Sequence, residues 1–301
     1  MSTPPIVTII IPSYNHQDYV GEAIESVLNQ TWPAIELVVI DDGSTDASVR
    51  VINDILATRG GFRFLHGHPN QGLMHSLNMG LELARGDYFC ELASDDFLPH
   101  DSIEKRALFF KSHPDYVAVF TDGLCVQGDA LTDQTILDDK RRLLFCQDDP
   151  IPSLLQGTLP VFATGLFRTK TMRDLGGFDP LFRCYEDLDM PLLLCQAGKI
   201  GFLDEPLFYR REHGTNTSTT TPTIKTDRIL CYQKLLNNPA FAKYTPILRR
   251  ELRRAYLRLG RHISTTRGGT SYERELFKGA WPHAYKDIRL LYHLLKWREK
   301  A

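Results

Sequence analysis

Short apolar runs alternate with longer segments of helical periodicity along the first hundred residues. The runs, many of them β-branched, predict strands at 6–11, 35–40, 62–65 and 88–90. Apolar residues spaced three and four apart predict amphipathic helices at 19–28, 49–56 and 70–84. This alternation predicts an α/β fold, in which a doubly wound and mainly parallel sheet with right-handed crossovers is flanked by helices.

The pattern is less regular after residue 97. A helix is expected at 103–112, a second helix opens at Tyr185, and short strands are expected at 116–120, 161–168, 200–203 and 207–210. The stretch 121–160 is rich in acids and predicts irregular backbone, either a lid or acceptor wall or a plain solvated loop. The threonine-rich stretch 215–223 predicts a linker or a lid.

Composition agrees with an ordinary folded protein. The 301 residues are 43% hydrophobic and 24% charged, which suits one large α/β domain with an appendage. Six scattered cysteines without a C-x-x-C pair suit reduced thiols, not a disulfide frame or a zinc site. No secretion signal and no apolar run of membrane-spanning length is recognisable, so we expect a cytoplasmic protein.

Charge divides the chain unevenly. Residues 225–301 hold 18 Lys and Arg against 6 Asp and Glu, whereas residues 1–224 hold 17 against 31. We therefore predict a sheet domain at 1–224 and a basic helical extension at 225–301. The extension suits a cap or a dimer contact, and basic amphipathic helices also suit peripheral contact with the inner face of the membrane. No nucleic-acid partner is expected, because the basic residues alternate with leucines that form a core.

Polar clusters follow three of the predicted strands, at Tyr14-Asn15, Asp41-Asp42 and Asp95-Asp96. In open parallel sheets the ligand lies beyond the carboxyl ends of the strands, so these clusters are expected to meet. Paired acids there suit a divalent metal that holds a diphosphate, whereas the plainer interpretation is turn and N-cap chemistry. No G-x-G-x-x-G follows the first strand and no P-loop occurs, which argues against a dinucleotide oxidoreductase and a P-loop NTPase.

A series of short motifs occurs in order from Ile6 to about Ser218. They are Pro12-Ser13-Tyr14-Asn15, Asp41-Asp42-Gly43-Ser44-Thr45-Asp46, Asn70-x-Gly72, Asn78-x-Gly80, Ala84-x-Gly86-Asp87-Tyr88, Ser94-Asp95-Asp96, Gly176-Gly177-Phe178-Asp179, Tyr185-Glu186-Asp187, and Tyr209-Arg210-Arg211 with His213. With these motifs the chain resembles glycosyltransferase family 2, whose members are inverting enzymes with the nucleotide-binding GT-A fold. This sequence differs from the family pattern at Ala93, where many members carry a further Asp, so its acidic cluster has one carboxylate fewer.

The resemblance implies a nucleotide site at the ends of the first strands. Its residues would be Pro12, Ser13, Tyr14, Asn15, Asp41, Asp42, Ser94 and Asp95. Tyr14 would lie against the base, usually uracil, and Asp42 would accept its ring N–H. Asp41 has a structural alternative, since an Asp here also braces the following turn.

The resemblance also implies a metal site for Mn²⁺ or Mg²⁺, with Asp95, Asp96 and His213 as ligands. The ion would neutralise the diphosphate leaving group. The alternative for His213 is a solvated loop histidine. Arg210 and Arg211 are alternatives for binding phosphate, because a guanidinium matches the geometry of phosphate oxygens.

In the family, the Asp of a Glu-Asp pair at this position is the general base, which implies that role for Asp187 with Glu186 as its neighbour. The structural alternative is that acids in a first helical turn favour the helix dipole. One carboxylate must take the proton of the acceptor hydroxyl as it attacks the anomeric carbon opposite the phosphate. Inversion in one displacement needs no protein nucleophile.

The expected function is therefore metal-assisted transfer of a hexosyl or N-acetylhexosaminyl group from a nucleotide-diphosphate sugar, with a UDP-sugar as the expected donor. The expected acceptor is a saccharide or lipid-linked saccharide in assembly of a bacterial surface polysaccharide. The alternative is a non-catalytic nucleotide-sugar scaffold or sensor of the same fold. A nucleotidyltransferase is disfavoured, because Pro12 to Asn15 stands where a glycine-rich, basic loop is required. The donor sugar, the linkage and the oligomeric state stay open.

Overall fold

The structure is a computed structural model that describes residues 3–128, 130–183, 186–213, 221–265, 270–284, 290 and 293–294. The chain divides into two compact units. The first comprises Met1–Leu154, Thr158–Pro180 and Glu186–Asn216, and the second comprises Leu155–Gly157, Leu181–Tyr185 and Thr217–Ala301. The expected linker or lid at 215–223 lies largely outside the described residues. The division into domains at 1–224 and 225–301 remains a prediction.

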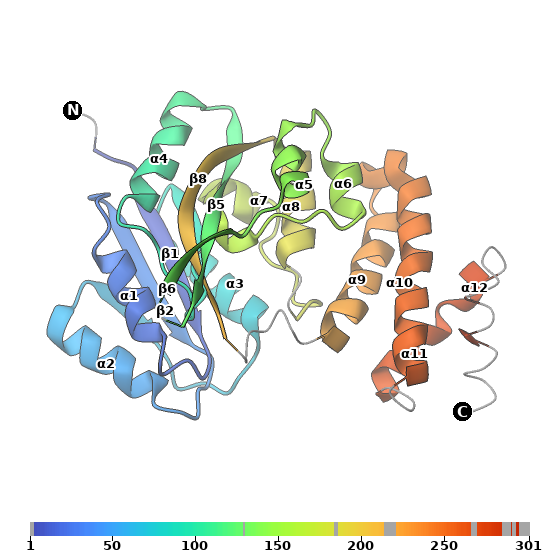
Figure 1. Ribbon diagram of the computed structural model, residues 1–301, viewed down its shortest axis with the longest axis horizontal. Coiled ribbons are helices and arrows are strands. Elements are labelled where there is room, and N and C mark those ends of the chain that lie inside the picture. Colours follow the sequence, from blue (N-terminus) through green and yellow to red (C-terminus); the bar gives the residue numbers. More distant parts are fainter. Residues whose placement is uncertain are drawn as a thin grey trace. The chain divides into compact units, whose positions relative to one another are not determined.

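The first unit is built on a mixed sheet that reads β3-β2-β1-β4-β7-β5-β6, with β8 paired to β5 (Figure 1). Its strands are β1 Val7–Ser13, β2 Ile35–Asp41, β3 Phe62–Leu65, β4 Tyr88–Glu91, β5 Tyr116–Gln127, β6 Ala130–Thr135, β7 Leu166–Arg168 and β8 Lys199–Glu212. Strands β1 to β4 pair in parallel, as do β5 and β8, whereas β7 is antiparallel to β4 and β5. The predicted α/β class with a mainly parallel sheet is thereby confirmed.

Helices cover both faces of this sheet because its central strands are apolar on both faces. Odd-numbered residues of β1, such as Ile9, join a core with α1 Val20–Leu28, α2 Ser48–Arg59 and α4 Ser102–Ser112. Ile10 faces the other way, into a core with α3 Leu73–Leu83, α7 Thr169–Asp174 and α8 Glu186–Ala197. The remaining short helices of this part are α5 Asp139–Arg142, η1 Leu143–Cys146, α6 Ile151–Leu155 and η2 Phe162–Thr164.

The prediction of irregular backbone at 121–160 was wrong over its first part. Strand β5 continues to Gln127 and pairs with β6. Asp122 is tolerated inside this sheet because its Oδ1 accepts hydrogen bonds from the backbone N–H groups of Gly123 and Leu137, at 2.7 and 3.1 Å.

Three of the predicted strands also need correction. A single strand, β8, replaces the two short strands expected at 200–203 and 207–210, and its register against β5 shifts near Pro206, which has no N–H to donate. The strand expected at 161–168 is a 3-10 turn, η2, followed by the three residues of β7.

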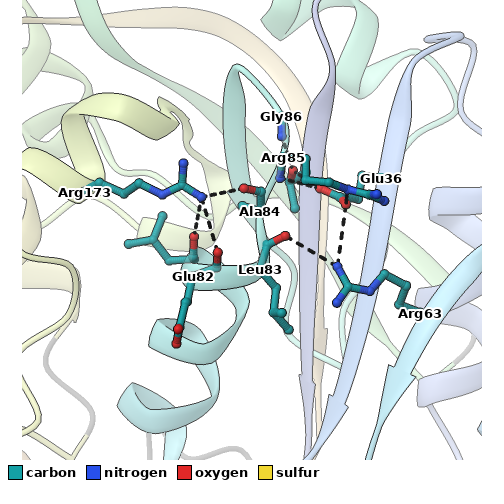
Figure 2. Close-up of polar contacts among 10 residues, drawn as sticks. Glu36, Arg63, Glu82, Leu83, Ala84, Arg85, Gly86 and Arg173 are labelled. Atoms are coloured by element: carbon teal, nitrogen blue, oxygen red, sulfur yellow. Dashed lines mark hydrogen bonds and ion pairs between the residues drawn. The ribbon is translucent and has the colours of Figure 1, made fainter.

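Polar contacts fasten the end of α3 to the sheet (Figure 2). The buried Glu36 carboxylate accepts hydrogen bonds from the Thr8 hydroxyl at 2.7 Å and from the Arg85 backbone N–H at 2.7 Å and side chain at 2.6 Å. Arg173 donates to the carbonyls that end α3, including Leu81 at 3.0 Å. Helix ends leave carbonyls without partners, so Arg173 satisfies groups that would otherwise cost stability.

The second unit is helical. It contains α9 Thr221–Leu236, η4 Pro239–Tyr244, α10 Thr245–Thr265, α11 Ser271–Lys278 and α12 Trp281–Ala284. Helices α9 and α10 pack together through buried side chains such as Tyr232 and Leu252. Among the described residues, no helix combines the length and apolarity needed to cross a bilayer. Contact of the basic helices with a membrane surface remains a prediction.

Candidate active site

The predicted polar clusters meet at one edge of the sheet because β1, β2 and β4 run parallel. Ser13 at the end of β1 pairs with Asp41 at the end of β2, and the Asp42 N–H donates to the Ser13 carbonyl at 2.8 Å. The end of β4 is also tied to β1, since the Leu92 N–H donates to the Ile10 carbonyl at 2.9 Å. The carboxyl ends of all three strands therefore open onto a common rim.

The loop after β1 is held in a defined shape by Asn15. Asn15 has a φ of 55°, a conformation that Asn adopts more readily than most residues. Its Oδ1 accepts from the Thr45 N–H and its own N–H donates to the Ser44 hydroxyl, both at 2.8 Å. These bonds join the first two clusters and leave Tyr14, which is 46% exposed, at the surface of the rim. Pro12 and Ser13 end β1 beneath it.

The two neighbouring acids of the second cluster make different contacts. Both oxygens of Asp41 bond to Ser44, one to its N–H at 2.9 Å and one to its hydroxyl at 2.5 Å, so Asp41 braces the turn. The buried Asp42 reaches instead to the loop before α3. It accepts from the N–H groups of Gln71 and Gly72 at 2.8 and 2.7 Å. Each carboxylate oxygen has a second lone pair, so Asp42 retains capacity to accept another donor.

The third cluster contributes to a group of metal-ligating side chains. His16, Asp95 and His213 each offer one ligand atom, and these atoms lie within 4.8 Å of one another. His213 Nε2 is 2.9 Å from Asp95 Oδ2, and His16 Nδ1 is 2.7 Å from the hydroxyl of Ser94. A carboxylate and imidazoles are suitable ligands for a divalent transition metal, so these residues fit the ion that the sequence implies.

Asp96 is placed differently from its neighbour. Its Oδ1 accepts the backbone N–H of Arg211 at 2.8 Å, and it is not a member of the group formed by His16, Asp95 and His213. Burial, followed by the adjacent Asp95, raises the pKa of Asp96 well above its ordinary value. Reciprocal backbone bonds between Phe97 and Tyr209 hold the loop against β8. A role for Asp96 as a metal ligand remains a prediction.

The side chain of Arg211 is engaged in the protein itself. Its guanidinium pairs with Glu22, donates to the carbonyls of Asp95 at 3.3 Å and Gly128 at 3.0 Å, and lies 5.3 Å from the centre of the Tyr19 ring. These contacts support the loop that carries Asp95. Arg210 contributes a positive charge that favours the ionised forms of Asp96 and Asp187. Phosphate binding by Arg210 or Arg211 remains a prediction.

Glu91, the last residue of β4, is an acid that the sequence analysis did not single out. It is 4% exposed, and its Oε2 has no hydrogen-bond partner in the described structure. Burial raises its pKa well above the ordinary value, and the charges of Glu186, Asp187 and Asp96 raise it further. Glu91 therefore shows that the Glu-Asp pair and the acids after β4 share one acidic environment.

Asp187 lies in the first turn of α8, where Glu186 begins the helix. Its Oδ1 accepts the backbone N–H of Phe162 at 2.6 Å. Desolvation raises the pKa of Asp187, while the Phe162 bond and the positive charges of Arg210 and Arg141 oppose that rise. A raised pKa brings a carboxylate closer to the range in which it accepts protons effectively.

A fully buried arginine fixes the turn that holds Asp187. Arg106 in α4 donates to the carbonyls of Thr164 and Gly165 at 3.3 and 3.2 Å, two and three residues after Phe162. Further bonds run to the hydroxyl and carbonyl of Ser102 in its own helix and to the sulfur of Cys90 in β4. No local pattern in the sequence indicates this contact, because an arginine in an amphipathic helix predicts an exposed position.

Three comparisons with known proteins bear on this site. The model of the family described as "Glycosyl transferase family 2" matches residues 8–153. The chain is 28% identical over 241 residues to a chondroitin synthase of Pasteurella multocida, covering 80% of this chain and 24% of that protein.

Solved structures extend the likeness over almost the whole chain. The crystal structure of S. aureus TarS 1-349 in complex with UDP-GlcNAc aligns with a TM-score of 0.66 at 18% identity, covering 98% of this chain and 89% of that one. The mannosyltransferase PcManGT from Pyrobaculum calidifontis, in complex with GDP-Man and Mn²⁺, aligns with a TM-score of 0.62 at 17% identity, covering 98% and 88%. These likenesses show a GT-A fold. The chain spans between 24 and 42% of the length of the first curated relatives it matches.

Proposed function

The chain belongs to glycosyltransferase family 2, and from that premise we propose that it transfers a sugar from a nucleotide-diphosphate donor to a saccharide acceptor with inversion. One observation carries the proposal. The loops that follow β1 and β2, with Tyr14 and Asp42, and the group formed by His16, Asp95 and His213 lie at the carboxyl ends of neighbouring parallel strands. The charges of Glu186 and Asp187 act on Glu91 at the end of β4, which supports a donor site and a base at the same edge.

The donor would lie along the ends of β1, β2 and β4. Tyr14 offers an exposed aromatic face, and Asp42 offers acceptor capacity beside it. An aromatic face with a fixed acceptor suits a pyrimidine, so we favour a UDP-sugar. The crystal structure of TarS 1-349 in complex with UDP-GlcNAc supports this choice, whereas the structure of PcManGT is a complex with GDP-Man.

Asp95 and His213 would hold the divalent metal, with Mn²⁺ bound in one structure of the same fold. When bound, such an ion neutralises the charge that develops on the departing diphosphate.

Asp187 would supply the base. Its Oδ2 is the oxygen that the Phe162 N–H does not hold, and the bond to Oδ1 fixes the carboxylate in orientation. The acceptor oxygen attacks the anomeric carbon, its proton passes to Asp187, and the bond to the nucleotide diphosphate breaks on the opposite face. A raised pKa of Asp187 makes this proton transfer easier.

The acceptor is proposed to be a saccharide or lipid-linked saccharide, by analogy with the chondroitin synthase that the chain resembles. A non-catalytic scaffold is the competing proposal. It retains nucleotide binding but predicts no cleavage of any donor.

The test is turnover of UDP- and GDP-sugars with Mn²⁺ by the wild type and by Asp187→Asn. The amide keeps an oxygen for the Phe162 N–H but accepts no proton, so we expect donor cleavage to fall about 10²- to 10⁴-fold. UDP affinity should stay within about twofold, because Asp187 does not hold the nucleotide. Asp54→Asn on the exposed face of α2 is the matched control. Loss of UDP binding in Asp187→Asn would contradict the base assignment, and UDP binding by a wild type without turnover would favour the scaffold.

A further inference from the structure

We propose that His16 is a direct third ligand of the metal, so that the ion is held by two imidazoles and one carboxylate. The inference rests on the metal requirement within the proposed function and deepens it. Neither the family motifs nor the relatives assign His16 a role. It follows the Pro12 to Asn15 motif directly and lies in the turn that leads into α1.

The distances fit a single ion. Ligand atoms about 2.1 Å from one ion lie about 3 Å apart when adjacent and about 4.2 Å apart when opposite. The 2.9 Å separation of His213 Nε2 and Asp95 Oδ2 matches an adjacent pair. The ligand atoms of all three side chains lie within 4.8 Å, so a small contraction closes the set around the ion.

The surroundings hold both imidazoles in place. The Ser94 hydroxyl lies 2.7 Å from one nitrogen of His16, and the His16 backbone N–H donates to Ser48 at 3.0 Å. The His213 ring stacks on Tyr19, with centroids 4.7 Å apart and planes 19° apart. Such outer contacts orient ligands before the ion arrives. The nearby Arg211 guanidinium is balanced by its ion pair with Glu22.

Two nitrogen ligands carry a chemical consequence. Imidazole suits transition metals such as Zn²⁺ and, more moderately, Mn²⁺, whereas Mg²⁺ prefers oxygen ligands and keeps its waters. The site should therefore bind Mn²⁺ in clear preference to Mg²⁺.

The test is Mn²⁺ binding by the full chain, measured by calorimetry and by pulsed EPR, which counts nitrogens bound to the ion. We expect two imidazole nitrogens in the wild type and one in His16→Gln. We also expect His16→Gln to weaken Mn²⁺ binding at least about tenfold, with a smaller loss for Mg²⁺. His100→Gln, the same change at an exposed histidine of the loop after Asp96, should leave both readouts unchanged.

The outcomes separate this inference from the proposed function. One bound nitrogen in the wild type, unchanged in His16→Gln, overturns the role of His16 while Asp95 and His213 stand. A Ser94→Ala variant distinguishes ligation from ring support, because it should retain two bound nitrogens with a modest loss of affinity. Absence of Mn²⁺ binding in a folded wild type overturns the inference and the metal part of the proposed function together, whereas donor turnover tests the function independently.

Discussion

At Gly43 a single added methyl group should push the loop after β2 away from the loop that contains His68 and Asn70. The φ of Gly43 is +79°, and a Cβ placed there would lie 2.8 Å from the Asn70 backbone nitrogen and 2.9 Å from the His68 carbonyl oxygen. Both atoms are backbone, so the loop itself must move. That loop carries the two N–H groups that bond to Asp42.

Three contributions set the change in the free energy of unfolding, and the control variant shares the first two. A side chain at positive φ costs roughly 1–2 kcal/mol, and the reduced freedom of the unfolded chain returns about 0.4–1 kcal/mol. Displacing the loop weakens hydrogen bonds to a charged acceptor that are each worth about 1.5–3 kcal/mol. We therefore expect Gly43→Ala to lower the free energy of unfolding by about 2–4 kcal/mol more than a control that has only the backbone strain.

Gly67 supplies that control, since its φ is +93° and nothing lies within 4 Å of an added Cβ. Thermal unfolding should show Gly43→Ala melting about 5–15 °C below Gly67→Ala. Titration with UDP should show at least a tenfold weaker affinity for Gly43→Ala alone. Equal melting temperatures and equal UDP affinities in the two variants would refute the argument that the close approach of Gly43 to His68 and Asn70 holds these two loops in place.

Three further predictions concern buried ionisable groups. Burial raises the pKa of Glu91, and the nearby acids raise it further. Because an unfolded Glu has a pKa of about 4.3, ionisation of Glu91 opposes folding above that pH. Glu91→Gln should therefore have a higher melting temperature than the wild type at pH 8, and the difference should shrink toward pH 4. The pKa of Glu36 shifts in the opposite direction. Desolvation raises it, but hydrogen bonds from Arg85 and Thr8 outweigh desolvation and lower it. Glu36→Gln should therefore have a lower melting temperature than the wild type at pH 7 and approach it as the pH falls below about 4. If the difference in melting temperature between either variant and the wild type did not change with pH, the cause given for that pKa shift would be wrong. Arg106→Lys should reduce kcat about tenfold with UDP affinity unchanged, because the shorter, non-planar cation cannot hold both carbonyls after Phe162. An unchanged kcat in a folded variant would show that Arg106 does not support Asp187.

Much of the fold was predictable because its signals are local. The β-branched run that forms β1 and the periodic apolar residues of α1 need no distant partner to be recognised. The continuous course of β8 was not predictable, since Pro206 normally interrupts a strand and only its irregular pairing with β5 accommodates it. The extension of β5 likewise depends on bonds from Gly123 and Leu137 that satisfy the buried Asp122.

The sequence by itself determined which residues stand at strand ends, because strand position and polarity are properties of neighbouring residues. It therefore indicated the acids Asp42 and Asp95, whereas the role expected of Asp187 came from the resemblance to the family. Only the tertiary structure decided what surrounds them. The approach of His16 to Asp95, the burial of Glu91 beside Asp187, and the support from Arg106 join segments far apart in the chain. Such contacts arise from sheet order and helix packing, which no local pattern of residues specifies.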